Sequence, residues 1–560
     1  MVKRFLRNGT SWLTSRQTSI LSAAAIMMVL MVASRILGLL RNWFLAGHFG
    51  AGGELDAYTI AFVFPDILAN ILITGALSVA FIPIFASFIT RGSKDEAWDL
   101  ASSVLNLSLI TFFIFGIIIF VFAPYFLNLF GLEPEFVPLA VTLTRIITLG
   151  ELLLVLGSFF SSVLQSYYRF IIPAIAPVLY NLGIIFGIVF LSPFFGIIGA
   201  ALGVLVGAFL HAISQIFVLQ KLQFHYRIRV DLKNPEVLKV LKLSLPRALG
   251  VGVSQLEWAV SIFLASLLAT GSVAILKFAQ DLQNFPIGIF GLTLATAALP
   301  TLSTEWASNK LEDFKTTFLS SLHQILYLSV PMSVILAVLR IPIVRLALGT
   351  GKFDWPATVA TATTMSYFAV GIFAQAAFLL TARAFYSMHD TVTPFKIGSI
   401  SLIIHVILSS SLLFIFGETA AIKVSFIGLS AAISGIFSFL TSLYLLDRRV
   451  GKFDRVKLFL PALKIIIASG AMAVLLYLPL HIKINGHYII DLIIDTTRAV
   501  NLLFLTGAVA TAGLGVYILL TWWFKSDELK AYLRLVPDIT KFKGFVALKE
   551  TIQTTKTTPT

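Results

Sequence analysis

The chain contains no cysteine, which excludes disulfide bonds and thiolate metal sites. Charged residues are also scarce: Asp, Glu, Lys and Arg make up 12% of the 560 residues, whereas about 25% is usual in soluble domains. Hydrophobic residues make up 58%. This composition excludes a soluble globular domain and predicts an all-α polytopic membrane protein.

The motifs of several enzyme classes are missing as well. No GxxxxGK[ST] loop is present, so direct use of ATP is not expected. The eight histidines show no HExxH or similar metal-ligand spacing, and no GxSxG nucleophile motif occurs. His211, His323 and His405 stand alone within apolar runs and are interpreted as core residues. We therefore expect a protein that is not an enzyme and that holds no metal and no cofactor.

Long apolar runs dominate the sequence instead. A helix that spans a bilayer needs about 20 mostly apolar residues, and fourteen runs meet that requirement. They cover residues of about 20–46, 57–90, 101–130, 138–167, 173–192, 196–220, 240–269, 273–303, 317–348, 357–386, 393–416, 423–446, 459–480 and 498–524.

The cations behind the net charge of +14 gather in alternate loops. Residues 1–19 are basic, the loop AGGELD at 51–56 has no cation, and the longest basic stretch lies at 221–242. The loop with Arg345 and Lys352 departs from this alternation. The positive-inside rule places both termini in the cytoplasm and explains the cations without a nucleic-acid partner.

Two sequence marks recur at one spacing. Pro83 and Pro300 each lie in an apolar run that a short charged loop follows, and Pro177 and Pro394 each follow an aromatic loop. Both offsets are 217 residues (300 − 83 and 394 − 177). Unless the resemblance is chance, two six-helix lobes are related by a parallel pseudo-two-fold repeat, as in some transporters.

This repeat predicts six segments along the chain. They are a cytoplasmic N-terminal segment (1–19), an N-lobe (20–222), a cytoplasmic linker (223–236), a C-lobe (237–446), two additional spans (459–524) and a cytoplasmic tail (525–560).

The first apolar run contains two arginines in the stretch SRILGLLRN, residues 34–42. A charge at the bilayer centre costs at least about 2.5–3.5 kcal/mol. On a helical wheel, Ser34, Arg35, Gly38, Arg41 and Asn42 share an arc of about 120°. We expect this polar stripe to avoid lipid.

Two explanations for these arginines are open. They pair with buried carboxylates, or they face a wet cavity and receive an anion, for which the planar guanidinium fork suits phosphate. The candidate carboxylates are Asp56, Asp66, Glu151, Glu257 and Asp281.

The stretch SRILGLLRN followed by FGAGGELDAYTIAFVFPDILANILITGALSVAFIPIF resembles the start of the MurJ (MviN) lipid II flippases of the MOP exporter superfamily. The segments YYRFIIPAIAPVLYN, SLPRALGVGVSQ, FPIGIFGLTLATAALPTLS, GKFD and FYSMHDTVTPFKI continue the resemblance in order, over residues of about 20–450. It implies fourteen spans in two six-helix lobes plus two extra helices.

The resemblance also implies a substrate site. Arg35, Arg41 and Asp56 match cavity residues that bind the lipid II pyrophosphate in that family. Spans 13 and 14 are expected to form a groove for the polyprenyl tail or to plug a lateral opening.

Some positions depart from the family pattern. Ala69 and Asn70 stand where arginines are usual, Thr74 replaces a glutamate, and Gln280 and Asp281 replace an Asp-Arg pair. Lys277, one turn before Asp281, either supplies a replacement cation or pairs with Asp281. Arg247 and Arg383 are further cations or interfacial anchors.

The leading hypothesis is therefore a flippase for lipid II, or for a related polyprenyl-diphosphate lipid, in the bacterial cytoplasmic membrane. Peptidoglycan synthesis would use the product, cell-wall synthesis proteins are candidate partners, and membrane potential or a coupled cation would drive transport. The alternatives are a cation-coupled small-molecule exporter, a non-transporting membrane scaffold and a lipid-processing enzyme.

Overall fold

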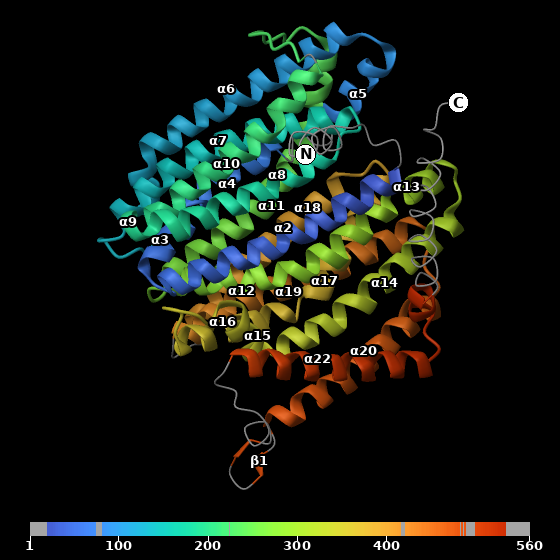
Figure 1. Cartoon of the computed structure of the whole chain (residues 1–560). Coiled ribbons are helices and arrows are strands. Elements are labelled where there is room, and N and C mark those ends of the chain that lie inside the picture. Colours follow the sequence, from blue (N-terminus) through green and yellow to red (C-terminus); the bar gives the residue numbers. More distant parts are fainter. Residues whose placement is uncertain are drawn as a thin grey trace, which may run out of the picture. The chain divides into compact units, whose positions relative to one another are not determined.

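The computed structural model describes residues 20–73, 81–222, 224–415, 420–481, 483–484, 487–488 and 499–533. Figure 1 shows the chain as a set of long helices. The helices of the first part are α2 (Ile20–Phe49), α3 (Gly53–Ala61), α4 (Val63–Asn70), α5 (Ile82–Arg91), α6 (Lys94–Leu127), α7 (Val137–Ser166), α8 (Ile171–Phe186), η2 (Gly187–Leu191), α9 (Ser192–Phe195) and α10 (Ile197–Lys221).

The later helices are α11 (Pro235–Ser266), α12 (Ser272–Pro286), η3 (Ile287–Leu292), α13 (Thr293–Ala307), α14 (Leu311–Val338), α15 (Arg340–Leu348), α16 (Trp355–Ala369), α17 (Ile372–Ser387), α18 (Val392–Ile415), α19 (Ala420–Arg449), α20 (Arg455–His481) and α22 (Ala499–Trp523). A short antiparallel pair, β1 (Lys483–Ile484) and β2 (His487–Tyr488), follows α20.

The helices confirm the predicted class of an all-α polytopic membrane protein. Within the described residues, thirteen helices are long and apolar enough to cross a membrane, and the count is fourteen if α16 and α17 form one broken span. Each of the fourteen predicted runs overlaps one of these spans. The predicted segment 1–19 and the part of the tail beyond residue 533 lie outside the described residues.

The chain packs as two compact units. The first unit comprises Met1–Phe285, Ile343–Phe368 and Asp390–Ser438, and the second comprises Pro286–Pro342, Ala369–His389 and Phe439–Thr560. The first unit runs past the predicted lobe boundary because α11 packs on α4 and α6. The two predicted lobes, related by the repeat, stay a prediction.

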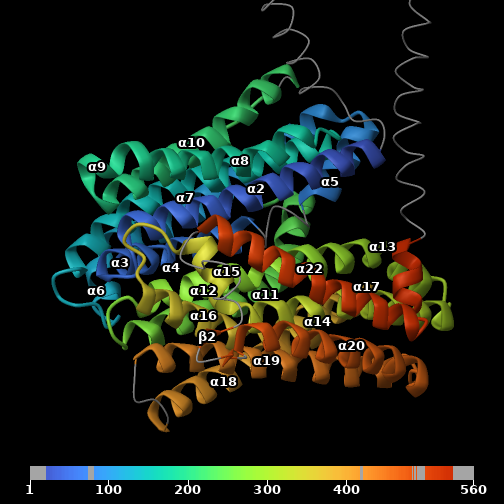
Figure 2. The same ribbon diagram turned by 60° about the horizontal axis from the view of Figure 1, so that its bottom comes forward.

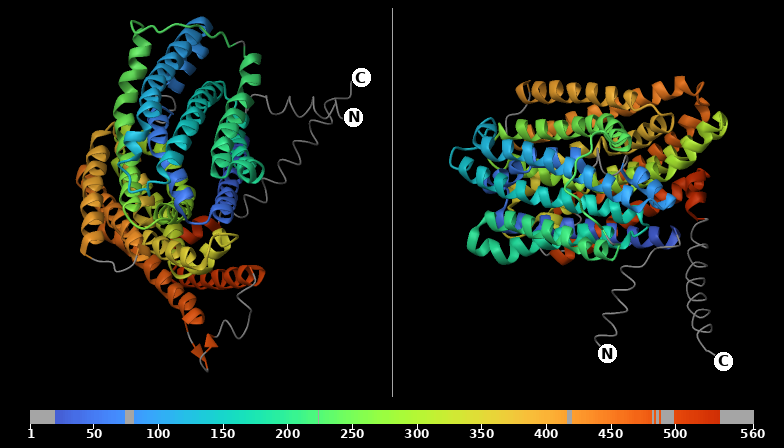
Figure 3. Two further views of the ribbon diagram at one scale, coloured as in Figure 1. Left: turned by 90° about the vertical axis from the view of Figure 1, so that its left-hand side faces the viewer. Right: turned by 90° about the horizontal axis from the view of Figure 1, so that it is seen from above.

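Small residues allow close helix packing in the first unit. Figures 2 and 3 show α6, α7, α8 and α10 running side by side. A Cβ atom on Gly183 of α8 would lie 2.3 Å from the Cα of Gly207 on α10, and one on Gly187 would lie 2.4 Å from the Cα of Gly203. Only glycine fits such contacts, so the glycine-rich run at 196–209 brings α10 into close contact with α8 and η2.

The predicted linker is fastened to α6 by hydrogen bonds. Asn106 Nδ2 donates to the backbone carbonyls of Arg227 (3.0 Å) and Arg229 (2.9 Å), and Asn106 Oδ1 accepts from Tyr226 (2.6 Å). Arg227 also forms an ion pair with Asp99 at 2.5 Å. Residues 226–229 of the linker between α10 and α11 are therefore held against α6.

Tyrosines join the helices of the second unit. The Tyr517 hydroxyl of α22 donates to the backbone carbonyl of Tyr327 on α14 at 2.8 Å. Lys464 of α20 donates to the carbonyl of Phe524, just after α22 ends, at 2.9 Å. Residues 527–533 are helical, and Tyr532 stacks on Tyr327. This part of the predicted tail is thus folded against the spans.

Candidate functional site: a cation cluster between spans 1, 5 and 8

Arg41 is the centre of a polar network inside the first unit. Helix α2 lies alongside α8 (Figure 1). The guanidinium of Arg41 donates to Asn42 Oδ1 from Nε (3.3 Å) and from an Nη atom (3.1 Å), and to Asn181 Oδ1 on α8 at 3.3 Å. Asn181 Nδ2 in turn donates to Ser34 Oγ at 3.3 Å and to the Pro177 carbonyl at 3.0 Å. Neutral amide oxygens therefore orient the arginine.

Asn42 connects this network to α12. Its amide oxygen accepts from Arg41, while its Nδ2 donates to Asp281 Oδ2 at 2.8 Å. Lys277 Nζ lies 2.6 Å from both carboxylate oxygens of Asp281. Asn42 is only 6% exposed, whereas the Lys277 and Asp281 side chains are 33% and 21% exposed. The ion pair is thus accessible from one side, and the amide that links it to Arg41 is buried.

Arg41, Asn42, Lys277 and Asp281 form the cation cluster, which lies within the apolar part of the spans. Arg41 is about two turns before α2 ends at Phe49, and Asp281 is about two and a half turns after α12 begins at Ser272. Both positions are roughly 12–14 Å from those helix ends, at a rise of about 1.5 Å per residue. The structure therefore pairs residues of equal depth on α2 and α12.

Arg35 lies two turns from Asn42 on the same face of α2, because residues seven apart nearly coincide on a helical wheel. It is exposed and makes no hydrogen bond or ion pair with any residue that the structure describes. The apolar residues Val29, Ile36 and Trp43 are exposed on another face. Arg35 thus lies on the same helix face as Asn42, about two turns away from it, and apart from Val29, Ile36 and Trp43.

The two explanations for the arginines can now be weighed. In the described part of the chain, neither Arg35 nor Arg41 forms an ion pair with a carboxylate, while Lys277 pairs with Asp281. Of the two roles open to Lys277, the structure therefore shows the pairing. Substrate contact by Arg35, Arg41, Lys277 and Asp281 stays a prediction, and the geometry leaves two guanidinium charges available to an anion.

Asp56 has a structural role at the start of α12. Its carboxylate is 4% exposed and accepts the backbone N–H groups of Gly271 at 2.6 Å and Ala274 at 2.7 Å. A carboxylate at a helix N-terminus satisfies free N–H groups and complements the helix dipole. Gly271 has a φ of +91°, and a Cβ there would lie 2.4 Å from the Ala51 carbonyl oxygen. The structure thus shows Asp56 as a helix cap, and its contact with substrate stays a prediction.

The other candidate carboxylates do not meet the arginines directly. Asp66 on α4 lies close to Glu151 on α7 and within electrostatic range of Lys277 and Arg41. Glu257 is half-buried on α11.

The positions that depart from the family pattern add no cation to the cluster. Ala69 is 1% exposed, and the Asn70 side chain donates to the Asp66 carbonyl at 2.9 Å. Thr74 lies outside the described residues. Arg247 and Arg383 are half-buried.

Asn181 is the site residue that the sequence reasoning missed. It lies one turn after Pro177 in the apolar segment IIPAIAPVLYNLGIIF and is 7% exposed. A lone asparagine deep in an apolar span is the signal that would have identified it, because an unpaired buried amide is costly.

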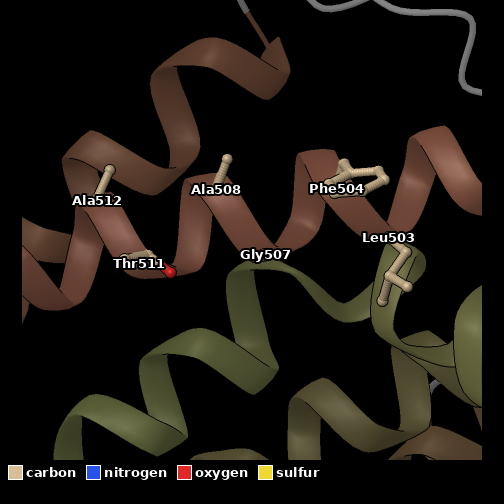
Figure 4. Close-up of a pocket in the computed structure, with 6 residues that line it drawn as sticks. All are labelled: Leu503, Phe504, Gly507, Ala508, Thr511 and Ala512. Carbon is tan, nitrogen blue, oxygen red and sulfur yellow. The ribbon is translucent and has the colours of Figure 1, made fainter.

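A second feature is a shallow, open depression along the exposed side of α22, the last span; its lining residues are labelled in Figure 4, and it is called the groove on α22 below. Its lining residues are Leu503, Phe504, Gly507, Ala508, Thr511 and Ala512. All six are exposed, and a Cβ built on Gly507 or on Gly515 meets no atom within 4 Å. The lining is small or apolar apart from the Thr511 hydroxyl, which suits contact with an extended apolar chain.

Within the described residues, the chain has thirteen or fourteen candidate spans, and Arg41 lies inside the first of them without an ion pair to a carboxylate. These are features of a membrane transporter. The family model described as lipid II flippase MurJ matches residues 45–495. The chain belongs to this family.

Individual relatives agree with that assignment. The chain is 30% identical to the probable lipid II flippase MurJ of Buchnera aphidicola subsp. Acyrthosiphon pisum, over 80% of this chain and 88% of that protein. It is also 30% identical to the lipid II flippase MurJ of Burkholderia cenocepacia, over 65% of this chain and 73% of that protein.

Solved structures show the same fold. A structure of lipid II flippase MurJ in an inward closed conformation matches with a TM-score of 0.74 and 26% identity, covering 90% of this chain and 99% of that one. A multidrug resistance MATE family transporter of the MOP superfamily matches with a TM-score of 0.63 at 16% identity, over 75% of this chain and 94% of that one. The second match concerns the fold alone.

Proposed function

We propose that this chain is a lipid II flippase, a transporter that moves lipid II from the cytoplasmic to the outer leaflet by alternating access for peptidoglycan synthesis. The observation that carries the proposal is the family match across residues 45–495. Members of this family are transporters rather than enzymes. The substrate is amphiphilic, so its translocation requires one polar and one apolar binding surface.

The cation cluster supplies the polar surface. Arg35 and Arg41 form no ion pair among the described residues, and Asn42 connects Arg41 to the partly exposed Lys277–Asp281 pair. A diphosphate offers several acceptor oxygens, and guanidinium groups bind such oxygens through paired N–H donors. We assign the diphosphate of lipid II to this cluster.

The groove on α22 supplies an apolar surface. We assign the polyprenyl tail to it, because its six lining residues expose only small or apolar groups and one threonine hydroxyl. Adducts from a photoreactive polyprenyl lipid should form at Gly507 and Ala508. If adducts form elsewhere on the protein and not on α20 or α22, these helices only cover a lateral opening.

Three further assignments belong to this proposal. The protein resides in the bacterial cytoplasmic membrane with both termini in the cytoplasm, as the basic loops indicate. Transport is driven by the membrane potential or by a coupled cation. Proteins of cell-wall synthesis are candidate partners because they make and consume lipid II.

The test is complementation of a bacterium whose own MurJ can be depleted. Expression of this chain should restore growth and the amount of lipid II that an added, membrane-impermeant lipid II hydrolase cleaves at the outer surface. Arg41→Ala should insert normally and restore neither. If the wild-type chain is present in the membrane at normal levels and cleavable lipid II does not return, the proposal fails.

A different polyprenyl-diphosphate-linked saccharide is the second candidate substrate. It is favoured by Ala69 and Asn70, which stand where the family pattern has arginines and which contribute no charge to the cluster. Liposomes that contain the purified chain and both lipids would decide between them by the relative rates of flipping.

A further inference from the structure

The cation cluster already contains an anion of its own. Lys277 Nζ contacts both carboxylate oxygens of Asp281 at 2.6 Å, and Asn42 donates a third hydrogen bond at 2.8 Å. A phosphate group presents a similar pair of oxygens to an ammonium group. The Asp281 carboxylate therefore occupies the position on Lys277 that a headgroup phosphate would need.

We propose that Asp281 is a specificity-determining residue: its carboxylate is an internal competitor that a headgroup with one negative charge cannot displace, whereas a diphosphate can. The inference rests on the proposed function and identifies the feature of the headgroup that the site selects. Ordinary phospholipids with a single phosphodiester charge surround a membrane protein in large excess. A flippase for a rare diphosphate lipid must reject them.

The first step of the argument is charge balance. Arg41 and Lys277 are the two cations that the Asn42–Asp281 contact joins, and Asp281 is the anion bound to Lys277. A diphosphate diester carries two negative charges at neutral pH, so it matches these two cations. A phosphodiester carries one and leaves one of the two cations unbalanced.

The second step concerns the exchange itself. A single-charge phosphodiester that replaces Asp281 on Lys277 gains no Coulomb energy, since one unit charge replaces another. It also leaves the carboxylate without its cation inside a span, which is strongly unfavourable. A diphosphate doubles the charge that faces Lys277 and reaches Arg41 as well, so its gain offsets the cost of releasing Asp281.

Displacement has a structural consequence. The Asn42–Asp281 hydrogen bond joins α2 to α12, and Asn42 also accepts from Arg41. A headgroup that takes Lys277 and Arg41 leaves Asp281 and Asn42 with only the hydrogen bond between them. Binding of the correct headgroup therefore loosens the contact between spans 1 and 8, and a rejected headgroup leaves the contact intact.

The experiment compares two lipids with the same polyprenyl chain and the same sugar, joined by a phosphodiester in one and by a diphosphate diester in the other. Affinities are measured for purified full-length protein in nanodiscs, for wild type and for Asp281→Asn. Wild type should prefer the diphosphate lipid by at least about tenfold. Asp281→Asn should bind the phosphodiester lipid about tenfold more tightly and lose most of the preference.

Three variants serve as controls. Asp281→Glu keeps the charge and should keep the preference. Asn284→Ala changes an exposed polar residue of the same helix and should leave both affinities unchanged. Lys277→Gln combined with Asp281→Asn replaces the ion pair by two amides, so it should also lose the preference, and it tests the proposal if Asp281→Asn alone does not fold.

The outcomes separate the two proposals. If wild type binds neither lipid, the proposed function and this inference both fail. If wild type prefers the diphosphate lipid and Asp281→Asn keeps the same ratio of affinities, the inference alone is overturned. An equal weakening for both lipids would also overturn it, because that result assigns Asp281 a purely structural role.

Discussion

Replacing Arg41 by glutamine removes one positive charge and leaves a side chain that can still donate to Asn42 or Asn181. For one charge of the diphosphate at about 4 Å from the guanidinium, and an effective dielectric constant of about 20, the interaction energy is about 4 kcal/mol. The neighbouring Lys277 and Asp281 side chains are 33% and 21% exposed, so water screens part of this energy, and we halve the figure to about 2 kcal/mol. This corresponds to a loss of about 30-fold in affinity for lipid II.

Arg41→Lys separates charge from geometry. Lysine keeps the charge but lacks the fork that contacts Asn42 and Asn181 together. We expect a loss of less than about tenfold. Arg145→Gln is the matched control, because Arg145 lies on α7 and donates to the Phe120 carbonyl. The Arg145→Gln protein should bind lipid II with the affinity of the wild type.

Affinity is measured for purified protein in nanodiscs with labelled lipid II, and flipping is measured in liposomes with the same variants. The reasoning would be refuted if Arg41→Gln bound lipid II within about threefold of wild type. It would also be refuted if Arg41→Lys were as damaging as Arg41→Gln, since charge would then not be the cause.

Four other predictions follow from particular contacts. Asp56→Ala leaves the N–H groups of Gly271 and Ala274 unpaired, so thermal unfolding should show a loss of about 2–4 kcal/mol; an unchanged unfolding temperature would contradict the cap. Gly183→Leu should prevent α8 from packing on α10 and reduce the amount of folded protein, judged by size-exclusion chromatography, whereas Gly470→Leu, in open space, should not. Gly507→Trp fills the groove on α22 and should slow flipping while leaving binding of a short-chain headgroup analogue unchanged; equal flipping rates would exclude the groove. Flipping in liposomes should accelerate under an inside-negative potassium-diffusion potential, since one charge across 100 mV is worth about 2.3 kcal/mol, and an unchanged rate would refute this.

The sequence allowed the spans and the arginine stripe to be predicted because both depend on local patterns. Hydrophobic runs of about 20 residues correspond to the helices. One face of α2 meets α8 and α12, and it carries Ser34, Gly38, Arg41 and Asn42. The sequence also indicates the close glycine contacts of α10, since small residues at helical spacing are typical of tight helix packing.

The sequence does not predict which residues the polar side chains contact. Asn42 meets Asp281, which is 239 residues away, and Asp56 meets Gly271, which is 215 residues away. The type of a residue shows that it needs a partner but not which one, because tertiary packing decides the choice among several acids. The family resemblance gave Asp56 a place in the substrate cavity, and its use as a helix cap became visible only with the backbone of α12.

The Lys277–Asp281 pair determines how steeply flipping depends on voltage. Family members with arginines in the second and eighth spans have additional charge to neutralise a diphosphate, while here Ala69 and Asn70 contribute none. Lys277 is paired with Asp281 at 2.6 Å in this structure, so it is available only to a headgroup that displaces Asp281. Such a headgroup meets Arg41 and Lys277 without second-span arginines, so it is less fully neutralised than in those relatives and the potential acts on more of its charge. We therefore expect a steeper voltage dependence here, and Lys277→Ala should steepen it further if the diphosphate displaces Asp281 from Lys277. If Lys277→Ala left the voltage dependence unchanged, Lys277 would serve only Asp281 throughout the transport cycle.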